Sequence, residues 1–115
     1  MIEGSCHCGS IRLEMELSQS TNSYAPRACD CDFCRMHGAS YISDPEGKLR
    51  IQVKSNENLS KYRQGSESAD FLVCRHCGVL VAVVYETNGK IFGTVNFKTL
   101  RLQEGFNQSV IVSPK

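Results

Sequence analysis

The sequence CHCGSIRLEMEL at residues 6–17 joins two cysteines to a segment in which apolar and polar side chains alternate without a break. This alternation predicts a half-buried β-strand over residues 11–17. A second stretch, CRHCGVLVAVVYE at residues 74–86, has the same order: a cysteine pair, a glycine and then a strand-like run. The two stretches therefore predict two cysteine turns, each of which leads directly into a strand.

Length and charge limit the classes of protein to which the chain can belong. It has 115 residues, with 13 Lys and Arg against 12 Asp and Glu. We therefore expect a single domain over residues 1–115 and no nucleic-acid partner, because no basic excess stands out. The start of the chain lacks the pattern of a signal peptide, and the apolar run at residues 79–85 is far shorter than the ~20 residues of a membrane span. These features predict a soluble, cytoplasmic protein with no membrane partner.

All seven cysteines fall into three short clusters: Cys6 and Cys8; Cys29, Cys31 and Cys34; Cys74 and Cys77. An odd number cannot pair completely within the chain, and a reducing cytoplasm keeps thiols free. Zinc is typically bound by close cysteine pairs from separate segments, so we interpret the clusters as zinc ligands. Buried core cysteines, disulfides and a thioredoxin-like use of residues 74–77 are the alternatives.

The neighbours of the cysteines suggest how the ligands divide. Gly9 and Gly78 follow the first and last clusters, and a glycine there can adopt a positive φ that turns backbone N–H groups towards thiolates. Cys34 is followed by Arg35 instead. We infer one closed site and one site with three cysteines and an open fourth position, the usual arrangement of a catalytic zinc. The closed site consists of Cys6, Cys8, Cys74 and Cys77, and the open site of Cys29, Cys31 and Cys34. The alternative is that His37 closes the second site as a structural centre.

The rest of the chain is rich in predicted strands. Besides residues 11–17, the candidates are 39–43, 49–53, 70–74, 79–86 and 90–96, with one short helical turn possible within 56–62. Asn88-Gly89 predicts a hairpin turn between the last two strands, and residues 44–47 predict another turn. The predicted fold class is mainly β: a small antiparallel β domain stabilised by zinc.

The residues also resemble a known family. The motifs GSCHCG at 4–9, CDCDFCRMHGA at 29–39 and FLVCRHCG at 71–78 resemble those of the glutathione-dependent formaldehyde-activating enzymes, a family that also includes centromere protein V. The similarity continues through SDPEGKLRI, residues 59–62 and FGTVNFKTL. This resemblance implies a β-tent fold, two zinc ions per chain divided as above, and a carbon–sulfur lyase. The family's type activity is condensation of formaldehyde with glutathione to S-hydroxymethylglutathione.

The expected chemistry gives roles to residues near the second cluster. A substrate thiol in the open position would be deprotonated by the metal and could add to an aldehyde carbon. His37 is the candidate that moves the proton, and Arg27 and Arg35 are candidates to bind substrate carboxylates. The two arginines could instead balance the negative charge of the thiolates. His7 and His76 lie inside the two cysteine turns and are expected to be exposed bystanders.

Two other functions remain open from the sequence. The first is a non-catalytic zinc-binding module for protein contacts or thiol carriage, with a second site that is closed or inert to thiols. The second is a nucleic-acid-binding zinc ribbon, which the near-neutral charge disfavours. The expected partner is a small thiol such as glutathione, and the sequence does not predict the oligomeric state.

Overall fold

The computed structural model describes residues 2–29, 32–44, 46–63, 69–87, 89–101 and 111–113. The described residues form ten strands: β1 (Ile2–Ser5), β2 (Ile11–Glu16), β3 (Arg27–Cys29), β4 (Ser40–Ile42), β5 (Lys48–Val53), β6 (Leu59–Tyr62), β7 (Ala69–Cys74), β8 (Leu80–Thr87), β9 (Lys90–Asn96) and β10 (Ile111–Ser113). They also form the α-helix α1 (Asp32–His37) and three 3-10 helices, η1 (Thr21–Ser23), η2 (Asn56–Asn58) and η3 (Phe97–Thr99). None of these helices has the length and apolar character needed to span a bilayer.

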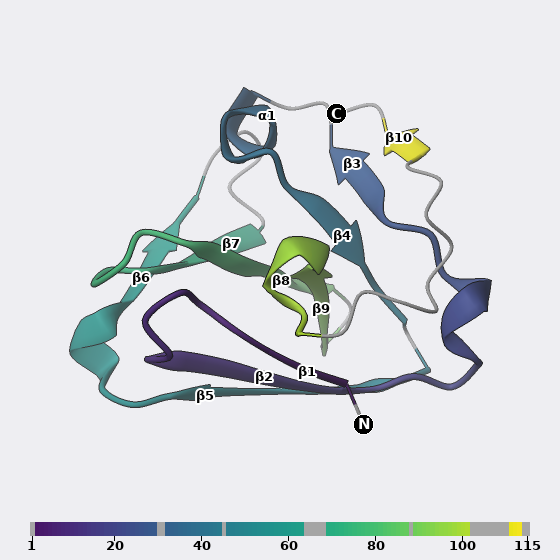
Figure 1. Cartoon of the computed structure of the whole chain (residues 1–115), viewed down its shortest axis with the longest axis horizontal. Coiled ribbons are helices and arrows are strands. Elements are labelled where there is room, and N and C mark those ends of the chain that lie inside the picture. Colours follow the sequence, from purple (N-terminus) through teal and green to yellow (C-terminus); the bar gives the residue numbers. More distant parts are fainter. Residues whose placement is uncertain are drawn as a thin grey trace.

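The strands form two sheets. One has the order β1-β2-β5, and the other has the order β10-β3-β4-β9-β8-β7-β6. All pairs are antiparallel except β10 with β3. In Figure 1 the three-stranded sheet lies below, the seven-stranded sheet curves above it, and α1 lies on the far side of the larger sheet. The prediction of a mainly β fold with antiparallel sheets is confirmed.

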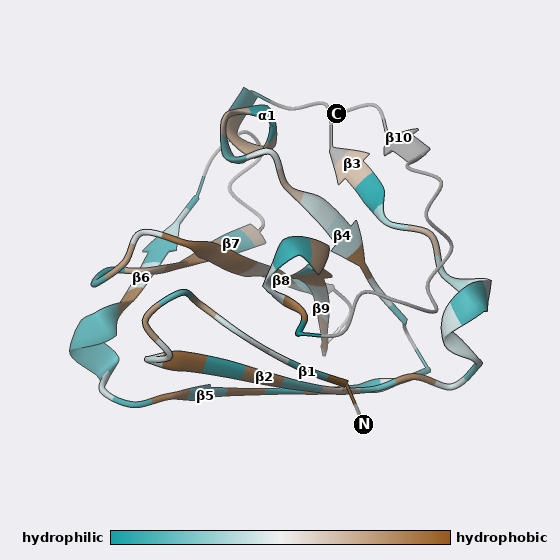
Figure 2. Ribbon diagram, in the orientation of Figure 1, coloured by the Kyte–Doolittle hydropathy of each residue, from teal (hydrophilic) through white to brown (hydrophobic). Residues whose placement is uncertain are grey.

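The main core lies between the two sheets. Ile11, Leu13 and Met15 on β2 are buried while the residues between them are more exposed, which confirms the predicted alternation. They share one cluster with Val81 and Val95 of the larger sheet. Figure 2 shows the hydrophobic residues concentrated along β2, β7 and β8. Burial of these aliphatic side chains is the main favourable contribution to folding, roughly 1.5–3 kcal/mol for each.

A second, smaller core lies on the other face of the larger sheet. Tyr41 packs there with Cys34, Phe71 and Leu80, while the next residue, Ile42, belongs to the main core. Successive side chains of a strand point to opposite faces, so β4 contributes to both cores. The larger sheet thus has one face towards the smaller sheet and one towards α1.

The predicted strands are present with small differences at their ends. The strand expected at 11–17 ends at 16, that at 39–43 spans 40–42, and that at 49–53 begins at 48. The strands expected at 70–74 and 79–86 span 69–74 and 80–87, and that at 90–96 is unchanged. The helical turn predicted within 56–62 covers only η2, because residues 59–62 pair with β7 as strand β6.

Both predicted turns are found where they were expected. Thr87 pairs with Lys90, and Gly89 has φ +75°, the left-handed conformation that the hairpin turn requires. Asn88 lies outside the described residues. In the other turn the Gly47 N–H donates to the Asp44 carbonyl at 3.0 Å, and Pro45 lies outside the described residues.

Strand β1 was not predicted from the sequence, and its outer edge is covered by the chain around η3. Gly4 forms a bridge with Leu100, and the Arg101 N–H donates to the Glu3 carbonyl at 2.9 Å. A Cβ at Gly4 would lie 2.7 Å from the Thr99 carbonyl oxygen. Glycine is therefore required here by close approach of two backbones.

We predict that Gly4→Ala lowers the free energy of unfolding by about 1–3 kcal/mol, because the methyl group meets backbone that cannot move aside easily. Urea denaturation measures the change. Glu3→Ala is the matched control, since the Glu3 side chain is 60% exposed and its pair with Arg101 is long at 3.9 Å. An equal effect of both variants would contradict the packing argument.

The Asp44 carboxylate ties the loop after β2 to the turn before β5. It accepts hydrogen bonds from the Tyr24 hydroxyl at 2.6 Å, from the Ser18 N–H and hydroxyl at 2.8 Å each, and from the Glu46 N–H at 3.0 Å. The hydrogen bond from Tyr24, followed by that from the Ser18 N–H, holds the pKa of this carboxyl well below its usual range.

We predict that Asp44→Asn destabilises the protein by about 1 kcal/mol at pH 7, since a partly exposed charged acceptor is lost. A depressed pKa stabilises the fold fully above the unfolded value of ~3.9. This contribution decreases as the pH falls below that value and is lost only below the lower pKa of the folded state. The difference between variant and wild type should therefore shrink as denaturation is repeated from pH 7 towards pH 3. Acid affects any bound metal in both proteins alike. Glu46 is exposed, so the control Glu46→Gln should have the same free energy of unfolding as wild type over this pH range.

Candidate metal centre

Four cysteines from two distant segments meet at one end of the main core. Cys6 and Cys8 lie in the turn between β1 and β2, Cys74 is the last residue of β7, and Cys77 lies in the turn between β7 and β8. Their sulfur atoms all lie within 4.8 Å of one another, and this cluster could hold a metal ion. Cys8 Sγ lies 3.7 Å from Cys6 Sγ and 3.6 Å from Cys74 Sγ. Tetrahedral zinc with Zn–S bonds of ~2.3 Å places its sulfurs about 3.8 Å apart, so the donor set fits zinc.

The two cysteine turns have closely similar backbones. Gly9 and Gly78 have φ +83° and +82°, as the sequence predicted. The N–H of Cys6 donates to the Ile11 carbonyl at 3.0 Å, and the N–H of Cys74 donates to the Val79 carbonyl at 2.9 Å. Each turn therefore closes against the first residues of the strand that follows it.

Backbone N–H groups also point at two of the sulfurs. The Ile11 N–H donates to Cys6 Sγ at 3.3 Å, and the Cys77 N–H donates to Cys74 Sγ at 3.4 Å. Such donors stabilise thiolates, which the metal-bound form requires. The predicted orientation of N–H groups towards the thiolates is confirmed.

The four thiols differ in their surroundings. Hydrogen bonding with Ser10, whose hydroxyl lies 3.2 Å from Cys8 Sγ, lowers the pKa of the exposed Cys8 to about 5, with a smaller contribution from His76. Burial raises the pKa of Cys74 to about 11. A metal therefore displaces a proton more easily from Cys8 than from Cys74. His76 is exposed, as predicted, but its hydrogen bond with Cys8 gives it a contact with the cluster that the sequence did not suggest. The part played by Ser10 was not predicted.

Of the middle cluster, the structure describes the side chain of Cys34. Cys29 ends β3, and Cys31 lies outside the described residues. Cys34 is 1% exposed and belongs to the smaller core, on the opposite face of the larger sheet from Cys6 and Cys74. Its sulfur lies 3.1 Å from the hydroxyl oxygen of Tyr41. The structure thus places Cys34 apart from the four-cysteine cluster.

The short helix α1 turns Cys34 inwards and its neighbours outwards. The Gly38 N–H donates to the Arg35 carbonyl at 3.0 Å, and the Ala39 N–H donates to the Cys34 carbonyl at 3.1 Å. Gly38 has φ +61°, a conformation that commonly ends a helix. Arg35 is exposed and paired with Asp32 at 2.6 Å, and His37 is exposed with its ring 4.6 Å from that of Phe33. The sequence analysis did not predict this helix.

A cavity of about 410 Å³ brings Arg27 and Tyr41 together. Its lining consists of Ser23, Tyr24, Ala25, Arg27, Tyr41, Ile42, Ser43, Tyr85, Gly93 and Thr94. Arg27 is the one charged residue in this lining, and most of the others are hydroxyl-bearing. Tyr41 lines this cavity and also contacts Cys34, which is not itself among the lining residues.

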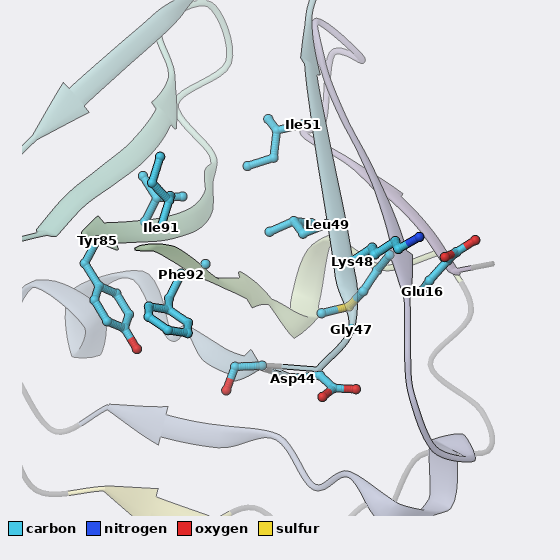
Figure 3. A pocket seen from close by; sticks show the side chains of 13 residues that line it. Glu16, Asp44, Gly47, Lys48, Leu49, Ile51, Tyr85, Ile91 and Phe92 are labelled. Atoms are coloured by element: carbon cyan, nitrogen blue, oxygen red, sulfur yellow. The ribbon is translucent and has the colours of Figure 1, made fainter. Parts of the chain in front are cut away.

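A neighbouring cavity of about 370 Å³ lies between β5 and the β8–β9 hairpin. In Figure 3, Leu49 and Ile51 project from β5 towards Ile91 and Phe92 on the hairpin. Its lining includes Asp44, whose carboxylate is already used by four hydrogen bonds, and none of the described cysteines.

The mainly β fold and the four-cysteine cluster together place the chain among small β proteins with a cysteine cluster able to bind a metal ion. A family model described as glutathione-dependent formaldehyde-activating enzyme matches residues 1–111, and the chain belongs to this family. It is also similar to a Rhodobacter sphaeroides protein of known crystal structure, with 33% sequence identity and a TM-score of 0.71. That similarity covers 96% of this chain and 99% of the other.

We predict that Cys77→Ser unfolds the chain or abolishes its soluble expression. A structural zinc contributes an apparent ~10–16 kcal/mol, which is comparable to the ~5–15 kcal/mol net stability of a whole domain. Cys31→Ser, outside the four-cysteine cluster, should give a folded protein that holds less metal. Circular dichroism and elemental analysis of both variants measure these outcomes, and similar unfolding of both would contradict the division of ligands.

Proposed function

We propose that the chain is a zinc-dependent carbon–sulfur lyase-like enzyme, acting as a single domain on the adduct of a glutathione-type thiol and an aldehyde such as formaldehyde. The observation that carries this proposal is the position of Cys34. It lies apart from the four cysteines that suffice for a structural zinc, and it contacts Tyr41, which lines a cavity large enough for a small molecule. Membership of the glutathione-dependent formaldehyde-activating family supports the same activity.

In this proposal the protein holds two zinc ions. Cys6, Cys8, Cys74 and Cys77 hold the first as a structural ion. Cys29, Cys31 and Cys34 hold the second, for which three thiols are a suitable donor set with one position left open. A zinc ion there would lower the pKa of a substrate thiol that binds it, so that the thiolate forms at neutral pH.

The reaction needs one proton transfer besides formation of the carbon–sulfur bond. The thiol sulfur adds to the aldehyde carbon, the carbon–oxygen π bond breaks, and the oxygen takes up the proton that the thiol released. In the reverse direction the carbon–sulfur bond breaks and the proton returns to sulfur. His37, exposed on the last turn of α1, is the group proposed to carry this proton.

The arginines are proposed to bind the carboxylates of the thiol. Arg27 supplies the single positive charge in the lining of the cavity beside Tyr41, which suits a carboxylate. Arg35 is exposed and already paired with Asp32, so it would have to exchange that partner for the substrate. Because it lines this cavity, Arg27 is the stronger candidate of the two.

A second candidate function is a non-catalytic zinc module that contacts another protein. One observation favours it: Met36 on α1 is 85% exposed and Tyr62 is 48% exposed, with the Tyr62 ring stacked 4.9 Å from that of Phe33. If these side chains form one apolar patch around α1, such a patch is typical of protein contacts. Both functions suit a reducing cytoplasm, where cysteines do not form disulfides, and neither involves nucleic acid.

Metal analysis with and without glutathione tests the enzyme proposal. Protein purified without chelator should contain two zincs per chain, and cobalt in the second site should change its absorption spectrum when glutathione binds. A spectrum indifferent to glutathione would favour the non-catalytic module. His37→Gln should keep both metals and lose about 10²–10⁴-fold in rate, whereas loss of one metal would mean that His37 is a ligand.

A further inference from the structure

The contact between Tyr41 and Cys34 has no role in the proposed function described so far. The two residues come from adjacent elements, β4 and α1, and their O···S distance is 3.1 Å. Tyr41 is 8% exposed and Cys34 is 1% exposed, so water competes little for this hydrogen bond. A hydrogen bond in such surroundings is stronger than one at the surface.

Chemistry decides the direction of this hydrogen bond once Cys34 binds a metal. A cysteine binds metal as a thiolate, which has no proton to give. The phenol of Tyr41 must then donate to Cys34 Sγ, and a donor to a ligating sulfur restricts its orientation and withdraws electron density from it. In the four-cysteine cluster the groups that donate to the sulfurs are backbone N–H groups, whereas Cys34 is contacted by the hydroxyl of a side chain.

We propose that Tyr41 is a positioning residue of the second metal site: its hydroxyl donates to the Cys34 thiolate and holds it in place beside the cavity. This inference rests on the proposed function, because it requires a metal on Cys34. It adds a chemical reason for the hydrogen bond. A ligand thiolate that has lost electron density is a weaker nucleophile, so the aldehyde reacts with the substrate thiolate rather than with Cys34.

The surroundings of Tyr41 suit this role. Its ring packs in the smaller core with Phe71, Leu80 and Val83, which limits its movement. Tyr41 also lines the cavity that contains Arg27, and these two residues are register partners on β4 and β3. A single side chain therefore connects the proposed position of the substrate with a proposed metal ligand.

Tyr41→Phe tests the inference because it removes the hydroxyl and keeps the ring. Zinc release to a chromogenic chelator should show a 10–100-fold weaker second site, while the four-cysteine site is unchanged and serves as an internal control for folding. Cobalt in the second site should show its sulfur-to-metal absorption at lower energy, since the thiolate becomes richer in electrons. Tyr62→Phe is the matched control and should behave as wild type, because Tyr62 is half-exposed on β6 and stacks on Phe33.

The outcomes separate this inference from the function on which it rests. Two metals in wild type with an unchanged second site and spectrum in Tyr41→Phe overturn the role of Tyr41 alone. A single metal in wild type overturns the three-cysteine site, and both proposals fail together. Weakening of both sites by Tyr41→Phe would mean that the tyrosine acts on the fold, and this also overturns its role as a positioning residue.

Discussion

The structure depends on the meeting of Cys6, Cys8, Cys74 and Cys77. The first pair, Cys6 and Cys8, is separated from the second pair, Cys74 and Cys77, by at least 66 positions in the chain. Their meeting places the β1–β2 turn of the smaller sheet against the β7–β8 turn of the larger sheet. No continuous hydrogen-bonded strand pairing joins the two sheets through the described residues. The sheets are held by the packed side chains between them, by the bridge at Gly4 and by this cluster. Ligation of all four sulfurs would fix the ends of both sheets at once.

The backbone of the two turns explains why so short a sequence can build this centre. Each turn needs one residue with positive φ, and glycine supplies it at positions 9 and 78. The chain then enters β2 or β8 immediately, so the strands are aligned by the same residues that present the sulfurs. The first residue of β2, Ile11, is fully buried and its N–H donates to Cys6 Sγ. Packing and ligand geometry are therefore set by the same few bonds.

The sequence allowed prediction of the elements whose signals are local. Strand β2 followed from alternation, the hairpin from Asn-Gly, and the grouping of four cysteines from two similar turns. Strands β1, β3, β6 and β10 were missed because they are recognised by their pairing with other strands and not by a local pattern. In β1, for example, Gly4 is required because the Thr99 carbonyl lies against it. Helix α1 has six residues, too few for a periodic pattern. The contact of Tyr41 with Cys34 joins two elements and has no signal in the order of residues.

The two faces of the seven-stranded sheet differ in what they contribute. The face towards the smaller sheet carries the main core and the four-cysteine cluster, whereas the face towards α1 carries Cys34, Tyr41 and the edge of the cavity with Arg27. A substitution at an exposed lining residue such as Arg27 or Ser43 therefore leaves the main core untouched. Such a scaffold can acquire a new specificity by changes on one face alone, without a compensating change on the other. For an engineer, the cavity lining around Arg27 is the part of the chain open to redesign, and the two glycine turns are the part to leave intact.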